Sequence, residues 1–222
     1  MTRTQLVGML SAIFLFVAIY FVFSYAEIEM TMLEVQKIFH FHVSSALTLF
    51  LAFGVTCISS ILYLIKRLDK YDTIALVSTE IGIVFGVVVF TTGPIWARFA
   101  WNTWWNWEPR LTSALILWLI YIGYLILRSA LAEEKKRVYS AVLGIIGFLN
   151  VPIVYYSVEL WQGGLHPDTS TKMNLPPTMQ VAWLISWLAL ILLYLFLLMF
   201  RYRAEQMKLE LDTIQHQQMS ES

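Results

Sequence analysis

Tryptophan is concentrated in one short stretch of this sequence. Five of the nine tryptophans fall within twelve consecutive residues, namely Trp96, Trp101, Trp104, Trp105 and Trp107. Residues three and four apart are neighbours on a helix. If this stretch is helical, three of the tryptophans therefore share one face with a carboxylate, and that face comprises Trp101, Trp104, Trp105 and Glu108. The pattern predicts an aromatic platform suited to stacking against a large planar apolar ligand. The alternative is an interfacial aromatic belt, which would place tryptophan at both membrane interfaces.

Histidine supplies a second kind of chemistry. His40 and His42 precede one long apolar run, and His166 lies between two others. On a helix His40 and His42 point about 200° apart, so only one of them can face a common site. Neutral imidazole is a good iron ligand, and two imidazoles would fill both axial positions of a heme. A hydrogen-bonding role is the alternative for each of these histidines.

Two arginines, Arg98 and Arg110, bracket the tryptophan stretch. Guanidinium groups bind carboxylates in a forked geometry, so both are candidates to pair with the propionates of a heme. The alternative is that they anchor helix ends at the lipid headgroups. The single cysteine, Cys57, lies in an apolar run, and there is no C-x-x-C-H motif with which the chain could attach heme covalently to itself.

The composition places these residues in a membrane protein. Of 222 residues, 59% are hydrophobic and 14% are charged, whereas soluble domains carry about 25% charged residues. The formal net charge is zero, which gives no electrostatic basis for binding nucleic acid. Lipid is therefore the expected solvent.

Six segments approach the length of about 20 apolar residues that a transmembrane helix needs. They cover residues 6–26, 41–65, 73–95, 111–127, 138–158 and 178–200. Backbone groups in lipid must be satisfied internally, which favours helices. We predict an all-α, polytopic membrane helix bundle that forms a single domain over residues 1–222, with the first apolar run retained as a membrane helix. Glu80 stands out as an ionisable residue well inside a predicted span.

The basic residues predict the orientation of this bundle. One set of helix ends carries Arg3, Lys66, Arg67, Lys70, Arg128, Lys135, Lys136, Arg137, Arg201, Arg203 and Lys208, whereas the opposite ends carry Lys37, Arg98, Arg110 and Lys172. Cytoplasmic loops are enriched in lysine and arginine. Both termini, including a tail over residues 201–222, are therefore expected in the cytoplasm, and the tryptophan-rich loop 96–110 is expected on the outer face.

Residues 101–115, WNTWWNWEPRLTSAL, resemble the tryptophan-rich "WWD" signature of the heme-handling proteins of cytochrome c maturation, and most closely that of the CcmC family. That family has six membrane helices, a periplasmic WWD loop and one histidine in each flanking outer segment. Residues 36–46 resemble the first of these segments, with His42 at the family's histidine, and residues 158–166 resemble the second, with His166 in place. Two features depart from the family pattern: Glu108, followed by Pro109, replaces an aspartate, and His40 is additional.

The resemblance implies a carrier rather than a catalyst, located in the bacterial inner membrane. Such proteins hold heme b non-covalently and transiently at the periplasmic face and pass it to the heme chaperone CcmE. They work with the small membrane protein CcmD and the ABC-type pair CcmA and CcmB. A shallow interfacial platform would suit this handover. The implied heme site comprises His42 and His166 as axial ligands, with Trp101, Trp104, Trp105, Trp107, Glu108, Arg110 and Arg98 around them.

Two other functions remain open on the sequence. A bis-histidine membrane cytochrome would transfer electrons, but it would usually place histidine pairs within its helices, often in both leaflets. A cytochrome c synthase component would attach heme directly, but that class normally has more helices or a large soluble domain. Both are therefore kept as alternatives to the carrier.

Overall fold

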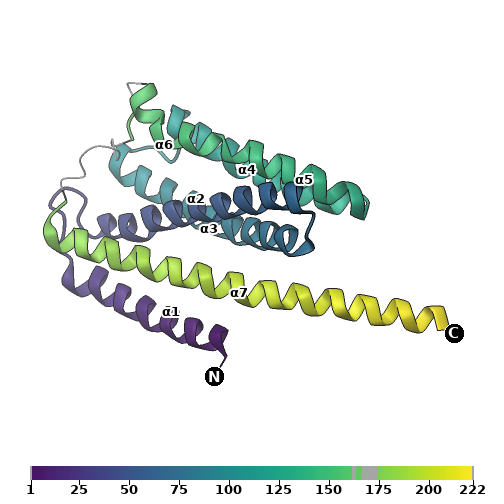
Figure 1. The fold of residues 1–222 in the computed structure, drawn as a ribbon. Helices are drawn as coiled ribbons and strands as arrows, with labels where there is room; N and C mark the ends of the chain where they lie inside the picture. The colour runs from purple at the N-terminus through teal and green to yellow at the C-terminus, as the bar shows by residue number, and fades with distance from the viewer. Residues whose placement is uncertain (1, 162–163, 167–174, 222) are drawn as a thin grey trace.

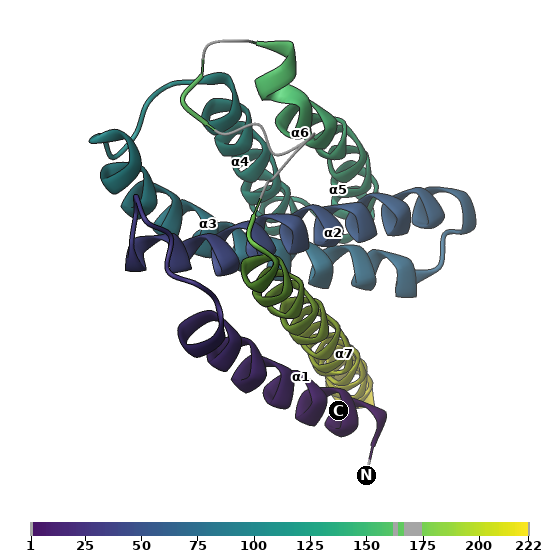
Figure 2. The ribbon, with the colours of Figure 1, turned by 90° about the vertical axis from the view of Figure 1, so that its left-hand side faces the viewer.

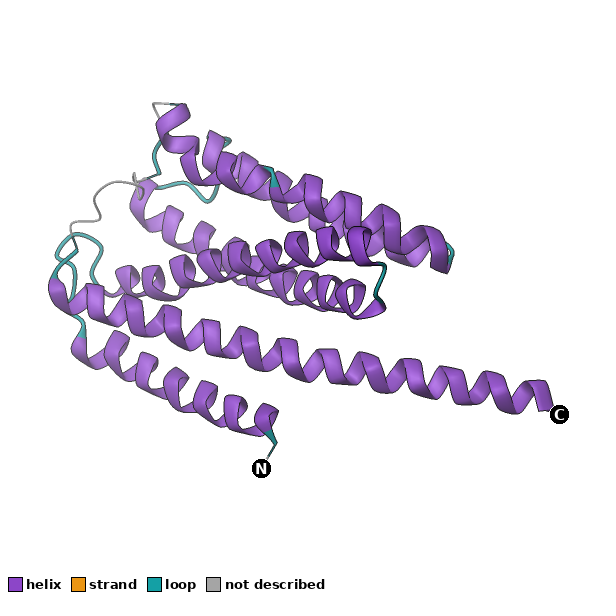
Figure 3. Cartoon of the chain, viewed as in Figure 1, coloured by secondary structure: helices purple, strands orange, loops and turns teal. Residues whose placement is uncertain are grey.

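The computed structural model describes residues 2–161, 164–166 and 175–221. Over these residues the chain is helical and contains no β-strand (Figure 3). Six helical segments within them are long and apolar enough to cross a membrane: Arg3–Tyr25, Glu34–Lys66, Asp69–Trp101, Pro109–Ala130, Lys135–Leu160 and Pro177–Leu211. The predicted polytopic membrane helix bundle is thus confirmed.

These spans are built from seven α-helices and two short helical turns. In chain order they are α1 (Arg3–Tyr20), η1 (Phe21–Tyr25), η2 (Glu34–Gln36), α2 (Lys37–Lys66), α3 (Asp69–Trp101), α4 (Pro109–Ala130), α5 (Glu133–Phe148), α6 (Asn150–Leu160) and α7 (Pro177–Glu221). The fifth span is divided between α5 and α6 at Leu149. Pro152 accounts for this break, because it has no N–H to donate to the carbonyl of Phe148 four residues earlier.

The helices form two groups around a central hairpin. α2 and α3 run side by side, with α4, α5 and α6 packed on one side and the pair α1 and α7 on the other (Figures 1 and 2). Both termini lie at the end of the bundle that also carries the α2–α3 and α4–α5 turns (Figure 1). The connections before η2 and between α3 and α4, and the C-terminal end of α6, lie at the opposite end, which we call the outer end (Figure 1).

Glu29 organises the connection that precedes η2. Its carboxylate accepts backbone N–H groups from Thr31 at 2.9 Å and Met32 at 2.5 Å. These hydrogen bonds stabilise the charged form and lower the pKa of Glu29. The first outer connection therefore has a defined turn that leads the chain into α2.

The core between the helices combines aromatic packing with paired polar groups. Phe53 of α2 stacks on Tyr121 of α4, with ring centroids 3.6 Å apart. The Tyr121 hydroxyl donates to the carbonyl of Gly144 at 2.9 Å, and the hydroxyls of Ser78 and Tyr194 are 2.8 Å apart. Because lipid cannot hydrogen-bond these groups, their pairing across helices fixes the helix register.

Charged residues inside the bundle are also paired. Glu80 of α3 binds Arg201 of α7, with its Oε2 atom 2.9 Å from Nε and its Oε1 atom 3.1 Å from NH2. Asp72 of α3 receives a two-point contact from Arg128 of α4, at 2.5 and 2.8 Å. Glu80 thus joins α3 to α7 by an ion pair, which lowers the cost of placing a charge within a membrane span.

Gly86 lies where α3 packs closely on α4, and there is no room for a side chain at this position. A Cβ atom there would lie 2.3 Å from Cδ1 and Nε1 of the Trp118 ring, which is pinned by its 3.1 Å hydrogen bond to the carbonyl of Ile83. Gly86→Ala should therefore cost about 1–3 kcal/mol of stability. Thermal unfolding in detergent should show a lowered Tm. Gly123→Ala is the matched control, because no atom lies within 4 Å of its Cβ position; equal loss in both variants would contradict this packing.

Candidate functional site

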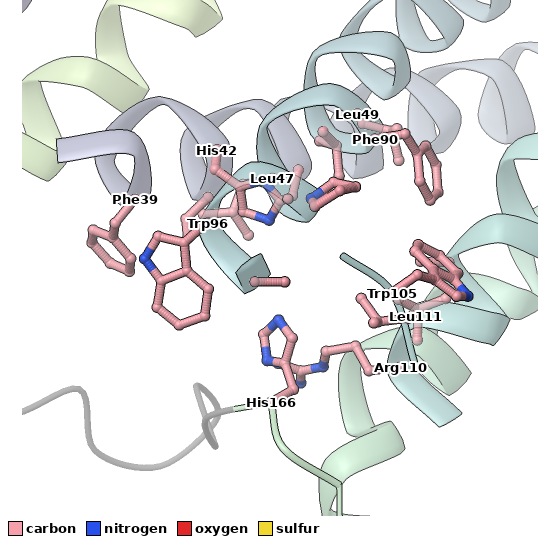
Figure 4. Close-up of a pocket in the computed structure, with 18 of the residues that line it drawn as sticks. Phe39, His42, Leu47, Leu49, Phe90, Trp96, Trp105, Arg110, Leu111 and His166 are labelled. Atoms are coloured by element: carbon pink, nitrogen blue, oxygen red, sulfur yellow. The ribbon is translucent and has the colours of Figure 1, made fainter. Parts of the chain in front are cut away.

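A cavity of about 360 Å³ opens at the outer end of the bundle. Its walls come from the start of α2, the end of α3, the α3–α4 loop, the start of α4, α6 and the segment containing His166. The residues that define its shape include Phe39, His42, Trp96, Trp105, Arg110 and His166 (Figure 4). The volume falls within the usual range for small-molecule sites, and the mainly apolar walls with a few polar groups are typical of them.

The cavity reaches deep into the bundle. Its lining extends from Gln36 at the end of η2 to Phe50 in α2, which is about 20 Å along a helix. At its inner end it is lined by Leu49, Leu117 and Val154, which belong to the hydrophobic core. This depth differs from the shallow interfacial platform expected from the sequence, because the aromatic residues form one wall of a cavity that is open at the outer end and reaches core residues at its inner end.

The tryptophan stretch is only partly helical. α3 continues past Pro94 to Trp101, and residues 102–108 form an irregular loop, so the single helix face proposed from the sequence does not exist. Trp101, Trp104 and Trp105 nevertheless line the cavity. Trp107 lies outside the lining, is 74% exposed and packs edge-on against Trp105.

Trp96 is a lining residue that the predicted set omits. Its indole Nε1 donates to the Oε1 atom of Gln36 at 3.3 Å, and its ring packs edge-to-face on Trp101 at 5.3 Å between centroids. Its spacing could have indicated this role, because Trp96 lies three residues after Gly93 and seven after Val89, and all three line the cavity. Such i, i+3 and i+7 positions share a helix face.

The structure separates the two histidines of α2. His42 lines the cavity, and its Nδ1 atom is 3.0 Å from the Thr92 hydroxyl on α3. His40 is 1% exposed, lies outside the lining and has no hydrogen-bond partner for Nδ1 among the described residues. The helical spacing therefore assigns one histidine to the cavity and one to the packing between helices.

His166 reaches the same cavity from the connection after α6. Its Nδ1 atom is 3.3 Å from the NH1 atom of Arg110, and its ring centroid is 5.9 Å from that of Trp101. Arg110 is itself fixed to α6, where NH2 donates to the carbonyl of Tyr155 at 2.7 Å and Nε contacts the Ser157 hydroxyl at 3.4 Å. Figure 4 shows the rings of His42 and His166 directed towards each other across the open space.

Glu108 holds the His166 segment in place. Its Oε2 atom accepts the backbone N–H of Leu165 at 2.6 Å and that of His166 at 3.2 Å. A Cβ atom at Gly164 would lie 2.9 Å from this oxygen, so the glycine allows the close approach. The carboxylate is buried and outside the cavity lining. It positions a loop, and the platform edge predicted for it from helical spacing does not form.

Arg98 lies outside the cavity lining. Its NH1 atom donates to the carbonyl of Asn102 at 2.7 Å and also to the Asn102 side chain. Asn102 has the left-handed conformation, with φ of 56°, that commonly ends a helix. Arg98 therefore caps the end of α3, and of the two arginines that bracket the tryptophans only Arg110 lines the cavity.

Comparison with known proteins identifies the family. The family model described as heme exporter protein C matches residues 2–217. The chain belongs to this family. It is 32% identical over 174 residues to heme exporter protein C of Paracoccus denitrificans, covering 76% of this chain and 72% of the relative. It is 29% identical over 219 residues to the Haemophilus influenzae protein of that name, covering 93% and 89%. For the Escherichia coli K12 protein the identity is 28% over 159 residues, covering 71% and 65%.

The Glu108 carboxylate clamps the backbone N–H groups of Leu165 and His166, and this clamp predicts a local effect of changing Glu108. Glu108→Ala removes the acceptor of two backbone N–H groups, so the amides of Leu165 and His166 should lose their protection in hydrogen–deuterium exchange. Hydrogen bonds to a charged group contribute roughly 1.5–3 kcal/mol each. Glu108→Asp keeps the charge and should retain most of the protection. Unchanged exchange in Glu108→Ala would contradict the clamp.

Proposed function

We propose that this protein binds heme in the outer-end cavity and hands it on during cytochrome c maturation. The observation that carries the proposal is the pair of imidazoles, His42 and His166, which face each other across one aromatic cavity (Figure 4). Membership of the heme exporter protein C family supports it. Two imidazoles on opposite sides of a planar ligand suit the axial positions of heme iron.

The remaining walls also fit a heme. Most of the lining is apolar, and indole rings favour stacking against a porphyrin face. Arg110 contributes a guanidinium at the same wall, suited to a propionate carboxylate. These groups would hold heme b without a covalent bond.

The charge distribution supports an orientation in the membrane. The end of the bundle that carries both termini also carries the α2–α3 and α4–α5 turns (Figure 1), around which most lysines and arginines of the loops fall. By the positive-inside rule this end lies in the cytoplasm. The cavity then opens at the periplasmic face of the bacterial inner membrane.

A carrier must also release its ligand. Trp104 lines the cavity and is 59% exposed, so part of the wall faces outwards. We infer that heme leaves on this side for a periplasmic chaperone of the CcmE type, with CcmD and the CcmA–CcmB pair as further partners. The protein acts here as a carrier, and sustained electron transfer from quinol through purified protein would instead favour the membrane cytochrome.

Absorption spectroscopy of protein purified from membranes tests the axial ligands. His42→Ala and His166→Ala should each lower the bound heme and shift its spectrum, because each removes one iron ligand. His40→Gln is the control, since His40 is buried outside the cavity lining, and it should leave the spectrum as in the wild type. Heme content and spectrum unaltered in both alanine variants would refute the assignment.

Changing Trp104 and Trp105 together to alanine tests the handover. Loss of two indole faces, each worth roughly 1–3 kcal/mol in stacking on a planar base, should weaken transfer to the chaperone while the protein still inserts. Transfer can be followed as the heme that appears on the separately purified chaperone. Trp161→Ala is the control, because Trp161 is exposed and lies outside the lining. Equal transfer by the double variant and the wild type would contradict this role.

A further inference from the structure

The two cavity histidines differ in what binds their Nδ1 atoms. Nδ1 of His42 lies 3.0 Å from the hydroxyl oxygen of Thr92, whereas Nδ1 of His166 lies 3.3 Å from a guanidinium nitrogen of Arg110. The partner of one ring nitrogen determines which nitrogen carries the proton in a neutral imidazole. A metal can bind only the nitrogen without a hydrogen, so these contacts decide which histidine is ready to act as a ligand.

Thr92 sets the proton position of His42. The Thr92 hydroxyl has a single hydrogen, and its oxygen lies 2.7 Å from the carbonyl oxygen of Val88, one turn earlier in α3. A carbonyl cannot donate, so the hydroxyl hydrogen points to Val88. The Thr92 oxygen must therefore accept from His42, which places the proton on Nδ1 and leaves Nε2 with a lone pair.

The residue after Thr92 makes room for this arrangement. A Cβ atom at Gly93 would lie 3.0 Å from Cε1 of His42, tighter than an ordinary van der Waals contact. The imidazole thus lies against the backbone of α3, with Thr92 binding one side of the ring. A second helix therefore holds the His42 ring in place. Metal-binding histidines are usually oriented in this way, by a hydrogen bond to the ring nitrogen that does not bind the metal.

Arg110 favours the opposite proton position in His166. A guanidinium has only donors, so Nδ1 of His166 must accept, and the neutral ring carries its proton on Nε2. Iron binding through Nε2 requires that proton to leave and another to be taken up at Nδ1, so the ring stays neutral. The second step requires the contact between NH1 and Nδ1 to break. Arg110 itself stays anchored to α6 through Tyr155 and Ser157.

We propose that the two histidines act unequally: Thr92 keeps His42 ready to bind iron, whereas Arg110 holds His166 back until a ligand carboxylate draws its NH1 atom away. This inference rests on the proposed heme-binding function. His42 then forms the first bond to iron and His166 the second. The second bond is the one that competes with a protein contact, so it is also the first to break on release.

Nitrogen-15 NMR on heme-free, full-length protein in nanodiscs tests the proton positions directly. With labelled histidine, long-range proton–nitrogen spectra distinguish Nδ1–H from Nε2–H, and the signals are assigned by their loss in His42→Ala and His166→Ala. We expect Nδ1–H for His42 and Nε2–H for His166 in the wild type. The reverse state at either ring would overturn the proposal.

Variants separate this role of Thr92 from general effects on α3. Thr92→Val should abolish the Nδ1–H preference of His42, and Thr92→Ser should restore it. Thr91→Val is a matched control, because the exposed Thr91 makes the same 2.7 Å bond to the carbonyl one turn earlier. Arg110→Met should release His166 into a mixture of both states. An unchanged ring in Thr92→Val or Arg110→Met, or a changed His42 in Thr91→Val, would count against the proposal.

Zinc protoporphyrin, which accepts a single axial ligand, tests the order of binding. We expect His42→Ala to lose this ligation and His166→Ala to retain it, with Thr92→Val weaker by about 10–100-fold, as for loss of other partners of metal-binding histidines. The opposite ranking would overturn the order. If the wild-type protein bound neither heme nor zinc protoporphyrin, the proposed function would fail, while the NMR result would still decide the proton positions.

Discussion

The fold depends on one constraint: backbone polar groups inside lipid need partners within the chain. Helices meet this need along the spans, with a break at Leu149 in the fifth, and most irregular backbone of the described residues lies at the helix ends. The loop of residues 102–108 and the segment around His166 are such irregular parts, and both lie at the outer end. A cavity with varied side-chain directions can therefore be built there, on top of a bundle that polar pairs such as Ser78 with Tyr194 hold together.

Much of this arrangement was predictable from the sequence. Apolar runs gave the six spans, and helical geometry showed that His40 and His42 could not share a site. The extent of α3 was not predicted, because the span was placed at residues 73–95 and residues 96–110 in a loop, yet the helix continues past Pro94 to Trp101. A proline removes one hydrogen bond, and the packing of α3 against α2 and α4 outweighs that loss.

The role of single charges was harder to predict than their positions. Arg98 and Arg110 look equivalent in sequence, but one caps α3 and the other contacts His166. Glu108 binds backbone amides more than fifty residues away in the chain. Such long-range partners depend on how the loops fold over the bundle, and local spacing carries no information about them. The depth of the cavity was missed for the same reason, since its inner end is formed by core residues of three helices.

Because the two histidines are far apart along the chain, the two halves of the cavity are synthesised at different times. His166 follows His42 by more than a hundred residues, and translation proceeds at roughly 5–20 residues per second. For several seconds the growing chain therefore has α2 in the bilayer while α4, α6 and the second imidazole are still missing. An unfinished chain cannot enclose a planar ligand, and a ribosome that stalls before residue 166 leaves a membrane fragment with half of a site.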